Sequence, residues 1–224
     1  TPADYDDMGS VLKKLGFSAT EIQYDDLKNL ATLEKYEAIY INCSGSIDSY
    51  ASPAASAIKD YVKNGGIIYA SDYANSIIEA AFPGKINFYK GNANESRIGT
   101  AGKVNATVSD PGLAAVLGKN TIEINFDMGA WAVIESVGGD ARIHIKGLVN
   151  AMDFSATDPK VWEEFGNIDF SNPAAVEQFN QKWSTLGKPI GEKPFVVSFS
   201  EGKGEVLYTS FHNEAQVTED VKSV

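Results

Sequence analysis

The sequence predicts an α/β domain built on a parallel sheet with helices on both faces. Short apolar runs typical of strands buried on both faces alternate with longer runs whose apolar residues recur at helical spacing. Such alternation is typical of parallel sheets, because two parallel strands need a crossover connection between them, usually a helix. The chain has 224 residues, of which 43% are hydrophobic, and this suits one globular domain with a substantial core.

The first forty residues predict a helix, a short strand, and a second short helix or turn. The opening helix covers residues 5–15, with its apolar residues on one face, and Gly16 ends it. A short strand is expected over 21–24, and a short helix or turn over 25–33. Residues 38–43 then form a nearly continuous apolar run, which predicts a strand buried on both faces.

The next helix is expected to begin at Ser52-Pro53, since serine caps helices and proline suits the first turn. Asn64-Gly65 ends this helix, because glycine readily adopts the left-handed cap conformation. A buried strand follows over residues 67–70. A further helix over 75–82 is stopped by Pro83-Gly84.

From Lys85 onward the pattern changes to shorter strands with alternating polarity, which predict antiparallel pairing with one wet face. We expect one domain over residues 1–224, with a β-rich and helical insertion at about 85–190. The expected elements after Lys85 are strands at 104–108, 122–126, 131–134 and 142–146, helices at 111–117 and from Asn172-Pro173 to Gly187, and strands at 195–199 and 205–210 joined by a hairpin at 201–204.

Four segments together resemble one known family. Tyr61–Ile68 contains the end of a helix, a double glycine and the start of a strand, and the strand runs into the turn Ala70-Ser71-Asp72-Tyr73-Ala74. Gly202–Ser210 is a late hairpin followed by His212, and Ile41–Gly45 is a strand with a glycine loop. In order and spacing these segments resemble the class I glutamine amidotransferase-like superfamily, and the late hairpin resembles its trehalose-utilisation-like branch.

The resemblance implies a flavodoxin-like fold, with a nucleophilic Cys on the strand-to-helix turn and an activating His after a late strand. His212 and Glu214 are present here, but the turn contains Ser71 and Asp72 and no cysteine. We therefore expect a non-catalytic, amidotransferase-like binding or assembly domain. The alternatives are a hydrolase that uses Asp72 or Ser71 with His212, and a carbohydrate-handling protein.

Asp72 has two interpretations. It is either a vestigial catalytic or crevice-lining carboxylate, or the cap of the helix that begins near Asn75. Ser71 and Asp72 should point in opposite directions, because side chains alternate along a strand. His212 is either a base oriented by Glu214 or a hydrogen-bonded residue at a strand end.

The residues that follow the strand at 38–43 are also expected to lie near the crevice. Cys43 is the only thiol and is expected to be a small buried residue. Ser44 and Gly45, which follow it, are candidate ligand-binding residues, since their backbone N–H groups could face an anion. Any ligand should lie above the carboxyl ends of the parallel strands.

Acidic and aromatic residues have weaker interpretations. The acidic residues Asp4, Asp6 and Asp7 favour the start of the first helix, with a Ca²⁺ loop as the alternative. Six aromatic residues either pack in the core or line a groove for a sugar or peptide: Tyr69, Tyr73, Phe88, Tyr89, Trp131 and Trp162.

Composition excludes several function classes. A net charge of −11 and a pI near 4.6 disfavour binding to nucleic acid or to anionic lipid. One cysteine and two histidines make a zinc site of the usual kind hard to build, so we expect neither a metal nor a cofactor. No apolar run is long enough to span a membrane. Asn-x-Ser/Thr triplets at Asn42, Asn94 and Asn105 hint at an extracytoplasmic location.

The family's first strand should precede the opening helix, and a helix usually follows the His-x-Glu segment. Neither is complete in this sequence, although residues 218–224 begin a helical pattern. We therefore expect the chain to be part of a longer polypeptide, whose other domains or protein partners it contacts. A small polar ligand or a sugar is a further expected partner.

Overall fold

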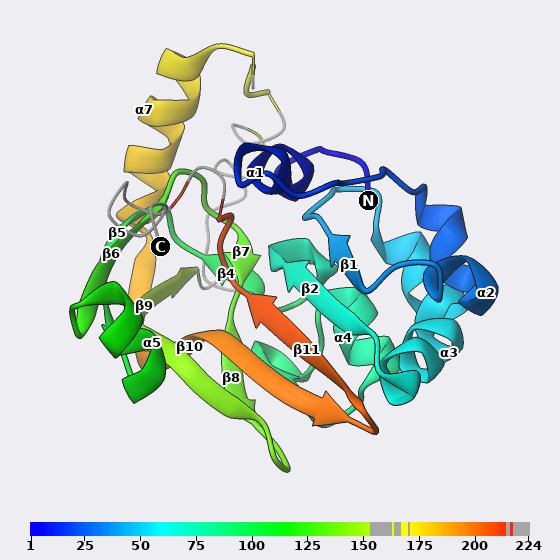
Figure 1. The fold of residues 1–224 in the computed structure, drawn as a ribbon. Helices are drawn as coiled ribbons and strands as arrows, with labels where there is room; N and C mark the ends of the chain where they lie inside the picture. The colour runs from blue at the N-terminus through cyan, green and yellow to red at the C-terminus, as the bar shows by residue number, and fades with distance from the viewer. Residues whose placement is uncertain (153–162, 164–166, 170, 214–215, 217–224) are drawn as a thin grey trace.

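The computed structural model describes residues 1–152, 163, 167–169, 171–213 and 216 of the chain (Figure 1). Within this part, a mixed sheet of nine strands dominates the fold, and a separate two-stranded sheet packs against it. The nine strands are β1 (Ala38–Ile41), β2 (Ile67–Ser71), β11 (Gly204–Thr209), β10 (Gly187–Glu201), β9 (Arg142–Met152), β4 (Arg97–Gly99), β7 (Trp131–Ala132), β5 (Gly102–Val108) and β6 (Thr121–Phe126). The small sheet pairs β3 (Ile86–Phe88) with β8 (Ile134–Val137).

The α/β class is confirmed, with a mixed central sheet. β1 pairs in parallel with β2, and β2 pairs in parallel with β11. From β11 onward the pairing is antiparallel, through β10 and β9 to the short strands at the far end. The predicted hairpin is confirmed as the β10–β11 pair, which closes at Glu201 and Gly204.

Three helices pack on one face of the parallel part of this sheet. α2, α3 and α4 form one core with alternate residues of β1, β2 and β11, such as Ile39, Ile68 and Val206. Intervening residues, such as Tyr40 and Leu207, lie outside that core because side chains alternate along a strand. The helices are α1 (Met8–Lys14), α2 (Leu30–Leu33), α3 (Asp48–Asn64), α4 (Asn75–Ala81), α5 (Pro111–Leu117) and α7 (Pro173–Ser184), with 3₁₀ turns at η1 (Tyr24–Lys28), η2 (Asp72–Ala74) and η3 (Tyr89–Gly91).

Several predicted boundaries are wrong; for example, the first helix begins at Met8, and the strand expected at 195–199 begins at Gly187. Residues 21–23 are not a strand, and Tyr24 begins the turn η1, because the Asp26 carboxylate accepts a hydrogen bond from the backbone N–H of Gln23 at 2.8 Å. α3 begins at Asp48, so Pro53 lies inside it. The earlier start coincides with an ion pair between Asp48 and Arg97, a contact that local sequence does not reveal.

A close backbone approach joins the hairpin to the end of α3. Gly65 caps α3 in the predicted left-handed conformation, with φ of 118°. A Cβ atom at Gly204 would lie 2.2 Å from the carbonyl oxygens of Val62 and Gly66, so only glycine fits there. This approach fixes β11 beside β2 and so sets where the segment after β11 emerges.

A second hydrophobic core is built mainly from residues between Ile98 and Met152 together with Phe195, Val196 and Phe211, whereas Ile86, Phe88 and Ile134 belong to the first core. The centre of the second core is an aromatic group in which Phe126 stacks on Trp131 at 4.1 Å between ring centroids, and both rings contact Phe195 of β10. The strands of this region continue the central sheet through β9 and β10. The division into a domain with an insertion stays a prediction.

Candidate functional site

The strand-to-helix turn after β2 has a strained backbone. Asp72 has φ of 42°, a left-handed value that residues other than glycine seldom adopt. Such strain costs about 1–3 kcal/mol and persists only where surrounding contacts enforce it. Here Tyr208 donates its hydroxyl hydrogen bond to the Asp72 carbonyl at 2.8 Å, and the Ala132 N–H donates to Asp72 Oδ1 at 2.7 Å.

The helix-capping interpretation of Asp72 is wrong. The helix α4 that follows has Ala74 at its N-cap position, and no side chain caps it. The Asp72 carboxylate instead turns toward β7, where it receives the Ala132 N–H from a segment 60 residues away. The side chain is almost fully buried, so this contact holds it in one orientation.

Asp72, His212 and Cys43 meet at the end of the parallel strands. Asp72 Oδ2 lies 3.4 Å from Nε2 of His212 and 3.5 Å from Sγ of Cys43. The three side chains come from the segments that follow β2, β11 and β1, which are neighbours in the sheet. The carboxyl ends of parallel strands meet at one edge, so this placement agrees with the predicted position of the crevice.

His212 is largely buried, and its pKa is raised. Burial is the largest single influence and lowers the pKa of the imidazole, but the carboxylates of Asp72, Asp6 and Asp127 together raise it by more. The Asp72–His212 contact is an ion pair without hydrogen-bond alignment, since buried Nε2 has no hydrogen-bond partner. The His212 backbone N–H donates to Gln216 Oε1 at 2.9 Å, and Gln216 in turn donates to Asp127.

Cys43 is fully buried, as predicted, but its surroundings are polar. Burial raises the pKa of its thiol far above the ordinary value, and the Asp72 carboxylate raises it further. The thiol donates to Asp72, while the Tyr73 N–H donates to Sγ at 3.5 Å. A thiol with so high a pKa is a poor nucleophile without a further positive partner.

Ser71 and Asp72 have different hydrogen-bond partners, although both contact Cys43, and the predicted alternation of the two side chains stays a prediction. The Ser71 hydroxyl donates to Asp6 Oδ2 at 2.7 Å and accepts from the Cys43 N–H at 3.1 Å. Ser71 is fully buried and does not line the pocket described below, so it is poorly placed to act as a nucleophile.

Ser44 and Gly45 lie on the other side of this network. Ser44 is buried and bonds Ser46, and the Gly45 N–H donates to Asp4 at 3.2 Å. Neither residue lines the pocket, and their ligand-binding role stays a prediction. Glu214 lies outside the described residues.

The three N-terminal acidic residues have separate structural roles. Asp7 caps α1 by accepting from the Ser10 N–H at 2.9 Å, which agrees with the predicted helix start. Asp6 is buried and takes part in the Ser71 network, whereas Asp4 holds the Gly45 loop.

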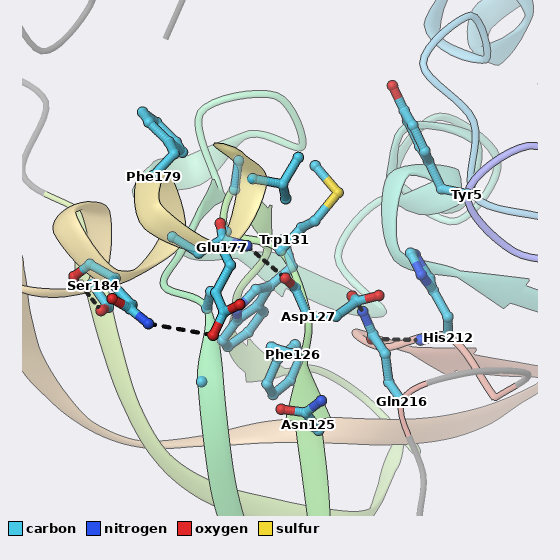
Figure 2. Close-up of a pocket in the computed structure, with 18 of the residues that line it drawn as sticks. Tyr5, Asn125, Phe126, Asp127, Trp131, Glu177, Phe179, Ser184, His212 and Gln216 are labelled. Carbon is cyan, nitrogen blue, oxygen red and sulfur yellow. Dashed lines mark hydrogen bonds between the residues drawn. The ribbon is translucent and has the colours of Figure 1, made fainter. Parts of the chain in front are cut away.

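A pocket of about 990 Å³ opens above Asp72 and His212 (Figure 2). Figure 2 shows Tyr5 and His212 on one side of it, and Glu177 and Phe179 of α7 on the other. Of the six aromatic residues with two interpretations, Tyr73 and Trp131 line the pocket, whereas Tyr69, Phe88 and Tyr89 do not. Trp162 lies outside the described residues. The described residues that line the pocket include three carboxylates, Asp72, Asp127 and Glu177. They include no lysine and no arginine.

Arg97 is a supporting residue that sequence reasoning missed. Its guanidinium lies 4.1 Å from the centroid of the Tyr73 ring and donates to the Tyr73 carbonyl at 3.0 Å. It also pairs with Asp48 and bonds Asn75 Oδ1 at 3.0 Å. Arg97 therefore stabilises the turn through contacts with Tyr73, Asn75 and Asp48, while Asp72 lines the pocket.

The second histidine belongs to a separate network. His144 Nδ1 lies 2.7 Å from Asp110 Oδ2, and His144 Nε2 lies 2.8 Å from Ser198 Oγ. This order of groups is that of a serine-hydrolase triad. However, Ser198 is buried within β10, and the strands on both sides pair with it, so neighbouring backbone N–H groups are engaged in the sheet. Asp110 also caps α5, and the network joins that helix to the sheet.

Comparisons with known proteins establish the fold alone. No protein-family model matches the chain, and no curated protein matches it in sequence. Among solved structures, the chain is similar to the cytoplasmic protein STM3548 from Salmonella typhimurium, with a TM-score of 0.51 and 13% identity over 90% of this chain and 73% of that one. It is also similar to the cytoplasmic protein STM1381 from Salmonella typhimurium LT2, with a TM-score of 0.52, 11% identity and the same coverage of 90% and 73%.

The helices of the described part give one further negative result. None of them combines the length and the apolar character that crossing a bilayer would require.

Proposed function

We propose that this chain is a non-catalytic, amidotransferase-like domain that binds a small polar ligand above the turn at Asp72. The observation that carries the proposal is the strained backbone of Asp72 in the lining of a pocket, with its carboxylate facing His212. Strained residues of this kind gather at functional sites, where surrounding structure holds them in place. In the resemblance described above, this turn is the position of the nucleophile.

The pocket walls favour a neutral polyol or sugar. Aromatic side chains such as Tyr73 and Phe179 offer apolar surfaces, while Asn125, Asn180 and Asp127 offer hydrogen-bonding groups beside them. The carboxylates disfavour phosphates and other anions, because no lysine or arginine of the described lining offsets their charge. A volume of about 990 Å³ has room for more than a single small metabolite.

We further propose that the domain works within a larger, extracytoplasmic polypeptide, in contact with a protein partner or with neighbouring domains. The exposed Asn-x-Ser/Thr triplets at Asn94 and Asn105 support this location, whereas Asn42 is buried and adds no support. A carbohydrate-handling role is compatible with the same pocket. The amidotransferase-like resemblance supports it only by analogy of fold.

One observation favours a hydrolase as the second candidate. The Asp72 carboxylate and the His212 imidazole face each other at 3.4 Å in a pocket, an arrangement that also serves proton transfer. Against it, Asp72 Oδ1 is occupied by the Ala132 N–H, and the nearest thiol is buried behind the carboxylate.

Calorimetric titration tests the binding proposal. We expect neutral mono- and disaccharides to bind the protein in buffer with EDTA, and sugar phosphates to bind much more weakly. Tyr73→Ala should weaken sugar binding by about tenfold, because a stacking surface is lost. Tyr40→Ala, a tyrosine of β1 outside this pocket, is the matched control and should bind as the wild type does.

Two results would contradict the proposal. Tight binding of anionic sugars in preference to neutral ones would remove the electrostatic argument. Turnover of amide or ester substrates, lost in both His212→Ala and Asp72→Asn, would establish the hydrolase instead.

A further inference from the structure

We propose that Cys43, Asp72 and His212 bind one divalent transition-metal ion of the zinc type, with a coordination position open to the pocket. The three donor atoms are Sγ, a carboxylate oxygen and an imidazole nitrogen, and all lie within 4.8 Å of one another. Thiolate, imidazole and carboxylate are the ligands that Zn²⁺ takes in proteins. The proposal stands independently of the sugar-binding pocket, and it differs from the expectation that composition alone gives.

The spacing of the donors fits a tetrahedral ion. Bonds of about 2.0–2.3 Å at tetrahedral angles place neighbouring donor atoms about 3.3–3.8 Å apart. The measured separations are 3.5 Å from Cys43 Sγ to Asp72 Oδ2 and 3.4 Å from that same oxygen to His212 Nε2. The remaining separation, between Cys43 Sγ and the His212 ring nitrogen, is at most 4.8 Å.

His212 supplies an independent observation. Its Nε2 atom is buried, faces Asp72 and has no hydrogen-bond partner among the described residues. Buried nitrogens of this kind nearly always have a partner, and one without a partner needs an explanation. A thiol-to-carboxylate hydrogen bond accounts for Cys43 and Asp72, but it leaves Nε2 unsatisfied. A metal ion between the three donors satisfies all of them.

Supporting contacts orient two of the three ligands. The Ala132 N–H holds Asp72 Oδ1, which leaves Oδ2 directed at the other donors. The Tyr73 N–H donates to Cys43 Sγ, a contact that stabilises a thiolate. Second contacts of this type keep metal ligands in position. When sulfur binds the ion, the thiol proton is released to solvent, so the metal forms its bond with the thiolate.

The pocket reaches the proposed metal site from one side only, and this predicts how many protein ligands the ion has and where its open position lies. Asp72 and His212 line the pocket, whereas Cys43 lies behind them and is fully buried. An ion held by three protein ligands therefore keeps its fourth position on the pocket side. Zinc sites with three protein ligands and an open position bind water or a substrate oxygen there.

Cobalt titration tests the site directly. Protein without an affinity tag, stripped with EDTA and dialysed, is titrated with Co²⁺ and followed by absorption. We expect one equivalent to bind with the intense visible bands of tetrahedral cobalt and a thiolate-to-cobalt charge-transfer band, and one equivalent of Zn²⁺ to abolish both. Cys43→Ala should lose the charge-transfer band, and His212→Gln should weaken binding by about tenfold or more.

Matched variants keep the test specific. His144→Gln and Asp25→Asn change the same residue types outside the three-ligand cluster and outside the pocket, and both should retain the wild-type spectrum and stoichiometry. Thermal melts of every variant establish that it is folded. Absence of one-equivalent binding at micromolar Co²⁺ or Zn²⁺ in the folded wild type would overturn the proposal, as would an unchanged spectrum in Cys43→Ala.

The same variants separate this proposal from the sugar-binding one. Cys43 does not line the pocket, so Cys43→Ala should abolish the cobalt charge-transfer band and leave sugar binding in EDTA intact. Tyr73→Ala should weaken sugar binding and leave the cobalt charge-transfer band intact, because the Tyr73 ring is not a ligand of the metal. Failure of either proposal therefore leaves the other testable.

Discussion

Arg97 and Asp48 form an ion pair with two parallel hydrogen bonds across 49 residues of sequence. Nη1 donates to Oδ2 at 2.8 Å, and Nη2 donates to Oδ1 at 2.6 Å. The Arg97 side chain is mostly buried, so the pair is screened less than one on the surface. It ties the start of α3 to the strand β4, beneath the turn that carries Asp72.

We expect Arg97→Lys to destabilise the protein by about 1–3 kcal/mol, because an ammonium cannot replace the planar, two-pronged contact. Urea unfolding measures the change. Lys103→Ala removes the exposed pair with Glu123 and should cost at most about 1 kcal/mol. Equal losses of unfolding free energy in the two variants would show that the two-pronged geometry of the Arg97–Asp48 pair contributes nothing to stability.

The His212–Asp72 pair should make stability depend on pH. The folded-state pKa of His212 lies above its usual value of 6.5, so the folded protein retains this proton more strongly than the unfolded chain does. The pair's contribution is therefore fully present below about pH 6.5 and is lost as pH rises through the raised pKa.

Urea unfolding in EDTA at several pH values, for the wild type and His212→Gln, checks this sign. The stability difference between the two proteins should shrink as pH increases past 6.5. Asp72→Asn should remove most of that dependence, because it removes the partner charge. A difference that grows with pH would contradict the assigned direction.

Ser198→Ala should destabilise the protein by about 1 kcal/mol, because it removes a partly buried hydrogen bond between the buried Ser198 hydroxyl and His144. Ser200→Ala, at an exposed position two residues along the same strand, should have little effect. Urea unfolding measures both. We also expect no labelling of Ser198 by a fluorophosphonate, since the hydroxyl is buried in the sheet. Labelling that His144→Ala abolishes would identify a second reaction centre.

Gly99→Ala should disturb the wall of the pocket. A Cβ atom at this position would lie 2.1 Å from the Trp131 ring, which stacks on Phe126 and donates from Nε1 to the Thr100 carbonyl at 2.9 Å. We expect a loss of about 1–3 kcal/mol by overpacking and a change in tryptophan emission.

Gly9→Ala is the matched control for this change. Its Cβ would meet only the Asp7 side chain, at 3.3 Å, inside α1, and alanine is the better helix former. Its effect on stability should therefore be small. A loss as large as that of Gly99→Ala would point to a general cost of removing glycine, and not to the tryptophan.

Local sequence patterns predicted the elements that depend on short-range signals. The apolar run at 67–70 predicted β2. The Asp110-Pro111 cap predicted the start of α5, and the turn glycines at 202 and 204 predicted the β10–β11 hairpin. The placement of His212 near Asp72 also followed from sequence, because neighbouring parallel strands end at one edge.

The remaining features of the site depend on contacts between distant segments. The orientation of Asp72 is set by the Ala132 N–H, and the start of α3 coincides with the pair between Asp48 and Arg97. A cap and a pocket carboxylate have the same local sequence, so the pattern around Asp72 does not distinguish them. Nor does composition show that Cys43 and His212, the only thiol and one of two imidazoles, are gathered at the same carboxylate.

The hydrogen bonds on Asp72 also bear on how the chain folds. They reach Ala132 across 60 residues and Tyr208 across 136, so the turn gains its left-handed geometry only once both distant segments have docked. Closing loops of that length is slow compared with forming a helix, and this places completion of the site among the last steps of folding. A chain in which only the first half has folded would contain every residue of the turn. It would lack the two hydrogen bonds, from Ala132 and Tyr208, that hold Asp72 in its left-handed conformation.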